Sequence, residues 1–388
     1  MAVPGAAISE LEGWKMLRPT WAEIDLGAIA HNIKLIKDYV GSETRVMAVL
    51  KADGYGHGAG AVARAALRAG AEYLGVATPD EAVELREGGI RGPILVMGPC
   101  LPGCSEDKMV ELDITQTVCT LEQAEATERA AARRGKRALV HIKVDTGMGR
   151  LGVPAGEGAD FIARVRNYPH LEIEGLFTHF AAADEGDKSY TWEQYKRFMK
   201  LVEELEERGL GVPPLKHVCN SAALLDLPEM HLDMVRPGAL LYGFHPGPHV
   251  VKRLPLQPAL SLKSRIVFLK GVEAGARLSY GLTYTAARAT RIATIPIGYA
   301  DGYRRLFSNR SEVLVRGRRA PVVGRVCMDQ CLIDVGQIPA VAIGDEVTLI
   351  GRQGDEEITA IELADLAGSL AIDLTCGIGK RVPRLYKE

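Results

Sequence analysis

The sequence lacks the features that mark membrane, secreted and nucleic-acid-binding proteins. None of its apolar runs approaches the roughly 18 residues that a membrane-spanning helix requires. The first residues, MAVPGAAISELEGWKMLRP, have neither a basic start nor an apolar core, so we expect no secretory signal. The formal net charge of −2 over 388 residues provides no field that would attract nucleic acid or an anionic membrane. We therefore expect a cytoplasmic protein that binds neither.

Cysteine is sparse and shows no disulfide framework. The chain has seven cysteines, an odd number, which suits a reducing compartment. Two close pairs, Cys100/Cys104 and Cys327/Cys331, have no histidine nearby at the spacing of a zinc site. We expect these four to be packing thiols and expect no metal site.

The fold signal lies in the first two thirds of the chain, where short β-branched runs alternate with amphipathic helices. Such alternation indicates a parallel sheet covered by helices. About eight strand–helix units, counting the segment WAEIDLGAIAHNIKLIKDYVG as the first, fit a closed (β/α)8 barrel in the available length. An open doubly wound sheet is the alternative, but no G-x-G-x-x-G motif opens a helix. We predict an N-terminal extension at residues 1–18 and an α/β barrel of the TIM type at residues 19–250.

The sequence pattern changes after about residue 250, where strand-like segments replace the alternation of strands and helices. Segments such as TRIATIPIGYADG and GDEVTLIGRQG read as strands joined by glycine turns, with one short helix expected at residues 360–368. We predict a C-terminal β-rich domain at residues 251–388.

One lysine stands out at the end of a predicted strand. In VMAVLKADGYGHGAG, an apolar run ends on Lys51 and is followed by glycines, Tyr55 and His57. At the carboxyl end of a barrel strand, Lys51 would face the active site. An apolar setting would lower the pKa of its amine and make it a nucleophile toward carbonyls, although many such lysines only extend their charge into solvent.

The segment AVLKADGYGHGA resembles the pyridoxal-phosphate attachment motif of the alanine racemase family. Eight further segments resemble that family in the same order, and together they span roughly residues 19 to 386: KVDTGMGRLG, THFAAAD, NSAALL, VRPGALLYG, LSYGLTYTA, IPIGYADGYRR, GRVCMDQ and RVPRLY. The resemblance implies a cofactor-binding barrel, pyridoxal 5′-phosphate joined to Lys51, a C-terminal β-domain and a homodimer with shared active sites.

The resemblance also implies the parts of a two-base racemase. Lys51 is one base, and Tyr280, supplied by the partner subunit, is the other. A tyrosine has a pKa near ~10, so it needs help to act as a base at neutral pH. His179 is placed to contact that tyrosine, and Arg236 faces the pyridine nitrogen of the cofactor. Because arginine keeps its proton, it cannot protonate that nitrogen fully, which suppresses side reactions.

By the same resemblance, other residues hold the phosphate and the substrate. The phosphate candidates lie at glycine turns and helix starts, and they are Tyr55, Asn220, Ser221, Gly238 and Ala239. Arg150 reaches the phenolic oxygen of the cofactor and the substrate carboxylate. Met328 offers a backbone N–H to that carboxylate, with Asp329 nearby, and Tyr299 lines the entrance. Lys143 matches a lysine that is carbamylated in some members, whereas a neutral lysine or a chloride ion is the alternative here.

One position departs from the family pattern. Some members carry a tyrosine directly before RVPR that contacts the phosphate and narrows the entrance, and this chain has Lys380 there. A lysine can still attract phosphate as a point charge, but it does not reproduce the aromatic constriction.

The sequence therefore favours an alanine racemase that supplies D-alanine for peptidoglycan. A broad-specificity or serine-preferring racemase of the same fold is the alternative. Non-catalytic cofactor carriers with this barrel would lack Tyr280 and the second domain. A basic amino-acid decarboxylase would need a cysteine acid in its β-domain, for which Cys327 is the candidate, but GYADG and KADGYGHG favour the racemase.

Overall fold

A computed structural model describes residues 17–388. The extension expected at residues 1–18 thus lies almost wholly outside the described residues. The described residues divide into two compact units: a barrel unit of residues Ile24–Leu260 with Tyr386–Glu388, and a strand-rich unit of residues 17–23 with Ser261–Leu385.

The barrel unit is built on eight parallel strands in one sheet. Their order is β10-β2-β3-β4-β5-β6-β8-β9, and the short β7 pairs with β6 outside this order. The terminal strands approach each other, because the N–H of Arg236 after β10 donates to the carbonyl of Cys219 after β9 at 3.1 Å. The predicted barrel is confirmed, nearly closed, and the open-sheet alternative is wrong. The strands are β2 Arg45–Val49, β3 Tyr73–Val76, β4 Ile94–Val96, β5 Thr115–Val118, β6 Ala138–Asp145, β7 Val153–Pro154, β8 Leu171–Phe177, β9 Leu215–His217 and β10 Met234–Val235.

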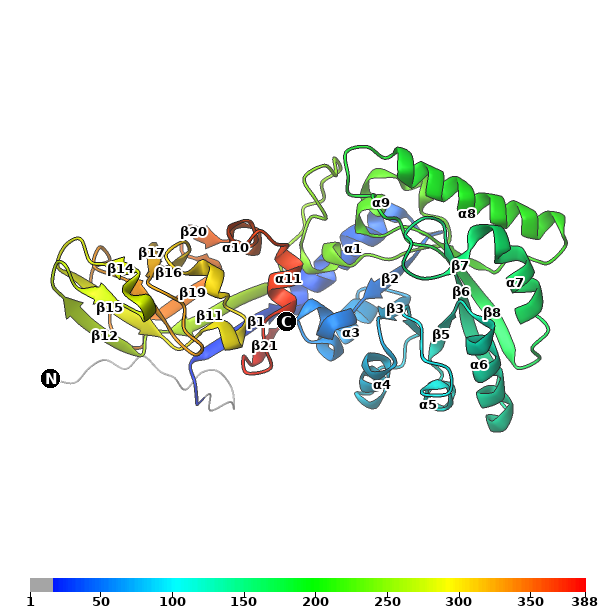
Figure 1. The fold of residues 1–388 in the computed structure, drawn as a ribbon, viewed down its shortest axis with the longest axis horizontal. Helices are drawn as coiled ribbons and strands as arrows, with labels where there is room; N and C mark the ends of the chain where they lie inside the picture. The colour runs from blue at the N-terminus through cyan, green and yellow to red at the C-terminus, as the bar shows by residue number, and fades with distance from the viewer. Residues whose placement is uncertain (1–16) are drawn as a thin grey trace. The chain divides into compact units, whose positions relative to one another are not determined.

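Helices follow the strands and surround them (Figure 1). Two of them begin with capping boxes, in which Thr78 pairs with Glu81 and Thr120 pairs with Gln123. These caps fix where α4 and α6 begin. The helices of the unit are α1 Leu26–Val40, α2 Lys51–Tyr55, α3 Ala59–Arg68, α4 Pro79–Glu87, α5 Glu106–Glu111, α6 Leu121–Arg134, α7 Gly158–Val165, α8 Ser189–Glu207 and α9 Ser221–Asp226.

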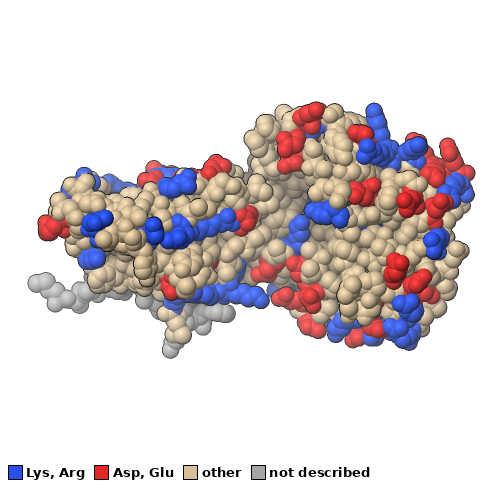
Figure 2. Space-filling model, viewed as in Figure 1, with Lys and Arg blue, Asp and Glu red and all other residues tan. Residues whose placement is uncertain are grey.

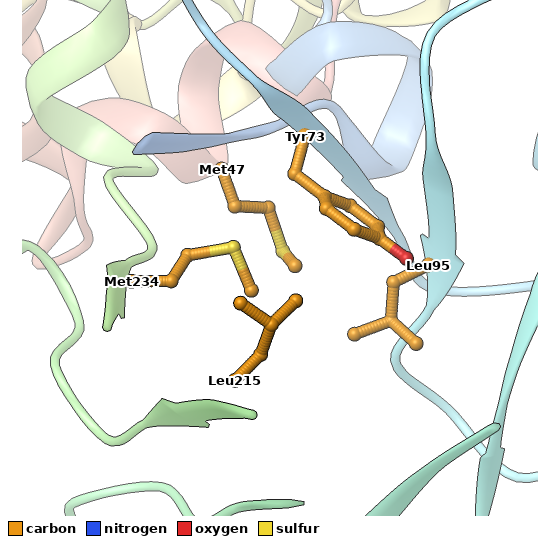
Figure 3. Close-up of a cluster of buried hydrophobic side chains, with 5 residues drawn as sticks. All are labelled: Met47, Tyr73, Leu95, Leu215 and Met234. Atoms are coloured by element: carbon orange, nitrogen blue, oxygen red, sulfur yellow. The ribbon is translucent and has the colours of Figure 1, made fainter. Parts of the chain in front are cut away.

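A cluster of large side chains fills part of the barrel interior. Met47, Tyr73, Leu95, Leu215 and Met234 come from five different strands and point toward one another (Figure 3). All are buried, with exposed fractions of 5% or less. The barrel interior is therefore a packed core, and an active site is expected at the ends of its strands.

The strand-rich unit holds a sheet in the order β12-β15-β18-β17-β16-β19-β11-β1-β21, with β20 paired to β19, and a separate β13–β14 hairpin. Strand β1 was expected to open the barrel, and that prediction is wrong because β1 pairs here with β11 and β21. The expected short helix is confirmed as α10. The elements are β1 Thr20–Asp25, β11 Leu260–Arg265, β12 Phe268–Val272, β13 Arg277–Leu278, β14 Tyr284–Thr285, β15 Thr290–Ile295, β16 Glu312–Val315, β17 Arg318–Val323, β18 Cys331–Asp334, β19 Glu346–Gln353, β20 Glu356–Ile358, α10 Ala360–Ala367, α11 Ala371–Cys376 and β21 Arg384–Lys387.

The surface charges, the helices and the cysteines can each be compared with what the sequence predicts. On the face of the barrel unit seen in Figure 2, basic and acidic side chains are interspersed. Within residues 17–388 we find no helix with the length and apolarity needed to cross a bilayer. Cys100 and Cys331 are buried as expected, but Cys104 is exposed, so the packing role predicted for it is wrong.

Candidate active site

Lys51 stands where a barrel strand ends, and the backbone after it is strained. Strand β2 ends at Val49, and after Lys51 the residues Ala52, Asp53 and Tyr55 have φ of 55°, 53° and 54°. Left-handed backbone costs roughly 1–2 kcal/mol for each residue that has a Cβ atom. Strain of this kind persists only where the surroundings enforce it.

Two carboxylates hold this left-handed turn. The N–H of Ala52 donates to Oε1 of Glu81 at 2.7 Å, and the N–H of Ala59 donates to Oδ1 of Asp53 at 2.8 Å. Lys51 is exposed in this turn. Its Nζ lies 6.0 Å from the centre of the Tyr55 ring.

Four cationic side chains gather around His179, just after β8. Burial lowers the pKa of His179 well below its ordinary value. The positive charges of four side chains lower it further, in the order Arg236, Lys143, Arg150 and Lys51. Burial, followed by the charges of Arg236 and Arg150, lowers the pKa of Lys143 to about 8. Arg150 is exposed, whereas Lys143 is buried. Such a concentration of positive charge is a site for an anionic ligand.

Arg236 follows β10 and is almost fully buried, with an exposed fraction of 4%. Its guanidinium donates to Nδ1 of His217 at 2.9 Å and lies 3.3 Å from Nδ1 of His179. It also donates to the backbone carbonyls of Thr178 and Val218. Burial lowers its pKa to about 10, so it stays charged at neutral pH. The hydrogen bonds to His217, Thr178 and Val218 hold the guanidinium in one orientation.

Two helix starts and a phenol form a cradle. The N–H of Gly238 donates to Oγ of Ser221 at 2.9 Å. Ala239 begins the 3-10 helix η4, Ala239–Tyr242. A Cβ atom on Gly238 would lie 2.5 Å from the phenolic oxygen of Tyr55, so only glycine leaves this space open. Asn220 caps α9, accepting from the N–H groups of Ala222 and Ala223 at 3.1 and 3.0 Å. A phosphate, which prefers backbone N–H groups and hydroxyls, fits these residues.

The sequence reading missed a supporting residue beneath this cradle. The Tyr242 ring packs against Tyr55, with 4.8 Å between ring centres, and against His57, with 4.5 Å, and both pairs are tilted. Its hydroxyl donates to the carbonyl of Val49 at 2.9 Å. Tyr242 thus ties the lysine strand to the aromatic pair that follows it. The available signal was its place in the apolar run GALLYG.

The remaining predicted residues belong to the strand-rich unit and are solvent-exposed: Tyr280 and Tyr299 begin short 3-10 helices, and Met328 lies in a loop. Tyr280, Met328 and Tyr299 have exposed fractions of 71%, 52% and 43%. Two hydrogen bonds join the segment of Tyr299 to that of Met328. The N–H of Tyr299 donates to the carbonyl of Cys327, and the N–H of Ala300 donates to the carbonyl of Met328, each at 3.0 Å. An open pocket of about 380 Å³ is lined by Ser279, Tyr280, Cys327, Gln330, Cys331 and Leu332.

Lys380, the departure from the family pattern, is exposed in a turn. The next residue, Arg381, pairs with Asp329 at 2.6 Å. Asp329 therefore has a partner within its own unit.

Comparison with known proteins covers nearly the whole chain. Family models described as alanine racemase N-terminal domain and C-terminal domain match residues 24–246 and 259–386. An alanine racemase from Halothermothrix orenii is 48% identical over 374 residues, which is 96% of this chain and 98% of its own length. One from Desulforamulus reducens is 50% identical over 373 residues, 96% of this chain and all of its own length.

Solved structures agree with these relatives. Alanine racemase from Clostridium difficile 630 matches with a TM-score of 0.91 at 40% identity, covering 96% of this chain and 97% of its own. The alanine racemase of Bacillus anthracis, solved with bound L-Ala-P, matches with a TM-score of 0.88 at 40% identity, covering 96% and 95%. With its barrel, its strand-rich unit and both domains matched, the chain belongs to the alanine racemase family of isomerases.

Proposed function

We propose that this protein interconverts L-alanine and D-alanine with pyridoxal 5′-phosphate held on Lys51. One observation carries the proposal: Lys51, Lys143, Arg150 and Arg236 gather where the barrel strands end. The cofactor has an anionic phosphate and phenolate, and the substrate adds a carboxylate. When bound, the cofactor withdraws electrons from the α-carbon of the amino acid joined to it, which makes the α-proton removable.

The barrel residues bind and orient the cofactor. Lys51 supplies the amine that joins it. Ser221 accepts from Gly238 and keeps its own hydroxyl hydrogen to donate to the phosphate, beside Ala239 and the phenol of Tyr55. Arg236, held by His217 and by backbone carbonyls, faces the ring nitrogen as a fixed cation. Asn220 supports the cradle by capping α9.

The second base comes from a partner subunit. Tyr280, Met328 and Tyr299 are solvent-exposed, and catalytic groups left in solvent would be poorly placed for proton transfer. A homodimer would bury them, with each subunit supplying Tyr280 to the other's lysine. His179, kept neutral by the cations around it, can then accept a hydrogen bond from that phenol.

Arg150 and Lys143 act together on the substrate side. Arg150 would bind the substrate carboxylate, helped by the backbone N–H of Met328, with Tyr299 and Lys380 near the entrance. Lys143, with a pKa of about 8, is neutral in about one tenth of the molecules at pH 7, far more than an ordinary lysine. That amine reacts with carbon dioxide to give a carbamate and a proton. The new negative charge would orient Arg150 and balance the cations of the site.

The role of the reaction is to provide D-alanine for peptidoglycan inside the cell. A broad-specificity or serine-preferring racemase is the competing function. The test is to incubate the purified protein with each L-amino acid and separate the products by chiral chromatography. Faster conversion of alanine than of any other amino acid supports the proposal, faster conversion of serine favours the alternative, and no conversion contradicts both.

A further inference from the structure

A chain of side-chain hydrogen bonds crosses the interior of the barrel. It begins at Arg236, whose guanidinium lies 2.9 Å from Nδ1 of His217. Nε2 of His217 lies 2.9 Å from Nδ1 of His141, and Nε2 of His141 lies 3.0 Å from Oε2 of Glu174. The chain ends at this carboxylate, and the hydroxyl of Tyr73 lies 2.8 Å from the same carboxylate oxygen. Both imidazoles are completely buried.

The direction of every hydrogen bond in this chain follows from its two ends. Arginine can only donate, so Nδ1 of His217 must accept and its proton must be on Nε2. That proton is donated to Nδ1 of His141, which places the proton of His141 on Nε2, facing Glu174. Both rings are therefore neutral and oriented alike. Burial lowers the pKa of each ring, that of His217 well below its ordinary value, which agrees with neutral imidazoles.

A β-bulge places Glu174 at the end of the chain. In the pairing of β6 with β8, Val140 lies opposite Ile173 and His141 lies opposite Gly175, so Glu174 is the extra residue between them. A Cβ atom on Gly175 would lie 2.4 Å from Nδ1 of His141. The bulge thus turns a carboxylate toward the histidine, and the glycine leaves room for its ring.

Arg236 lacks a direct counter-ion among the described residues. Its hydrogen bonds go to ring nitrogens and backbone carbonyls, and its charge acts unfavourably on neighbouring Lys143. A buried charge without compensation is costly. Although burial alone would raise the pKa of Glu174, the hydrogen bonds from His141 and Tyr73 and the positive charge of Arg45 hold it below its ordinary value. Glu174 is therefore a carboxylate, one-fifth exposed, at the far end of the chain.

We propose that Glu174 is a positioning residue that acts as the counter-ion of Arg236 through His141 and His217. By fixing the tautomer of both imidazoles, it keeps an acceptor aimed at the guanidinium and so holds Arg236 in place. Only the statement that Arg236 faces the cofactor ring rests on the proposed function. The charge and hydrogen-bond relationship is a property of the chain itself.

The wild-type chain gives the first test. Histidine-selective 15N labelling of the full-length protein, with and without added pyridoxal phosphate, reports which ring nitrogens carry a proton. We expect His141 and His217 to be neutral, with the proton on Nε2 in both, near neutral pH. A proton on Nδ1 of either ring would reverse the chain and overturn the proposal. This outcome does not depend on racemase activity, so it is separable from failure of the proposed function.

Substitution of Glu174 gives the second test. Glu174→Gln removes the charge at nearly constant shape, and we expect it to shift the ring signals of both His141 and His217, although His217 does not touch residue 174. Glu174→Asp keeps the charge and should restore much of the wild-type spectrum. Glu172→Gln is the matched control on the same strand, because Glu172 is half exposed and pairs with Arg137 at 3.4 Å.

The outcomes separate a positioning role from a merely structural one. A Glu174→Gln variant that folds and shifts His141 alone, with His217 unchanged, would overturn the proposal, as would a spectrum equal to that of Glu172→Gln. If Glu174→Gln does not fold, the tautomers of the wild-type chain and the spectrum of Glu174→Asp still decide the question.

Discussion

Gly238 lies directly against the phenol of Tyr55: a Cβ atom on the glycine would be 2.5 Å from the phenolic oxygen. Gly238→Ala should therefore displace Tyr55 from the phosphate cradle. Overpacking of this kind costs about 1–3 kcal/mol, so we expect cofactor affinity to fall about 5- to 150-fold. Fluorescence titration with pyridoxal phosphate measures this loss. Gly156→Ala is the control, because nothing lies within 4 Å of a Cβ at that position. Equal affinity of the two variants for pyridoxal phosphate would show that Gly238 is not part of the cofactor-binding site.

The attachment lysine is tested by chemical trapping. Borohydride treatment of the wild-type protein with pyridoxal phosphate should fix the cofactor to Lys51, and Lys51→Ala should abolish the adduct. Lys196→Ala, within helix α8, is a control lysine that should leave the adduct unchanged. An adduct of normal yield in Lys51→Ala would show that another amine holds the cofactor.

Carbamylation of Lys143 should follow its lowered pKa. Carbon dioxide reacts with neutral amines, and the pKa of about 8 makes Lys143 half neutral at that pH, whereas an ordinary lysine reaches this point near 10.5. We therefore expect 13C-bicarbonate to give a carbamate NMR signal that grows with pH around a midpoint of about 8. The signal should be absent in Lys143→Met. A midpoint near that of ordinary lysines would contradict the account of this residue.

The same shift predicts a dependence of folding stability on pH. Between about pH 8 and 10.5 the unfolded chain binds a proton on Lys143 that the folded chain has released. Stability from this group therefore rises with pH across that window, and the unfavourable contribution is complete below it. Urea unfolding without bicarbonate should show a smaller rise for Lys143→Met than for the wild type. An equal rise in both would show that Lys143 is not the source.

The barrel was predictable because alternation of strand and helix patterns is a local signal. The place of β1 was not, since its partners β11 and β21 lie more than 200 residues away along the chain. The motif around Lys51 was visible, but the left-handed turn was not, because Ala52 has a Cβ atom and no preference for positive φ.

The hydrogen-bond chain from Arg236 to Glu174 was also missed by sequence reasoning. His141 and His217 lie in largely buried strands, where a polar residue is a weak hint of an internal network. Their relation to Glu174 depends on a β-bulge, and a bulge has no reliable sequence signature. These features arise from pairing between strands, so only the structure reveals them.

The shared-site hypothesis makes a prediction for mixed dimers. Lys51→Ala and Tyr280→Phe should each be nearly inactive alone. A dimer of one with the other contains one site with both Lys51 and Tyr280 intact, so equal mixing and refolding should recover about a quarter of wild-type activity. Wild-type subunits refolded in parallel provide the reference. If the mixture stays inactive while that reference recovers, the two residues do not come from different subunits.

The two-base account is tested by α-proton exchange in deuterated water, followed by NMR from each pure enantiomer of alanine. With Lys51 acting on D-alanine and Tyr280 on L-alanine, Tyr280→Phe should keep exchange from D-alanine. Exchange from L-alanine should fall by about 10²–10⁴, the usual value of general-base catalysis. Racemisation must fall equally in both directions, because the equilibrium between enantiomers cannot change. Equal loss of exchange from both enantiomers would indicate a single shared base and contradict the assignment of Lys51 and Tyr280 to opposite faces.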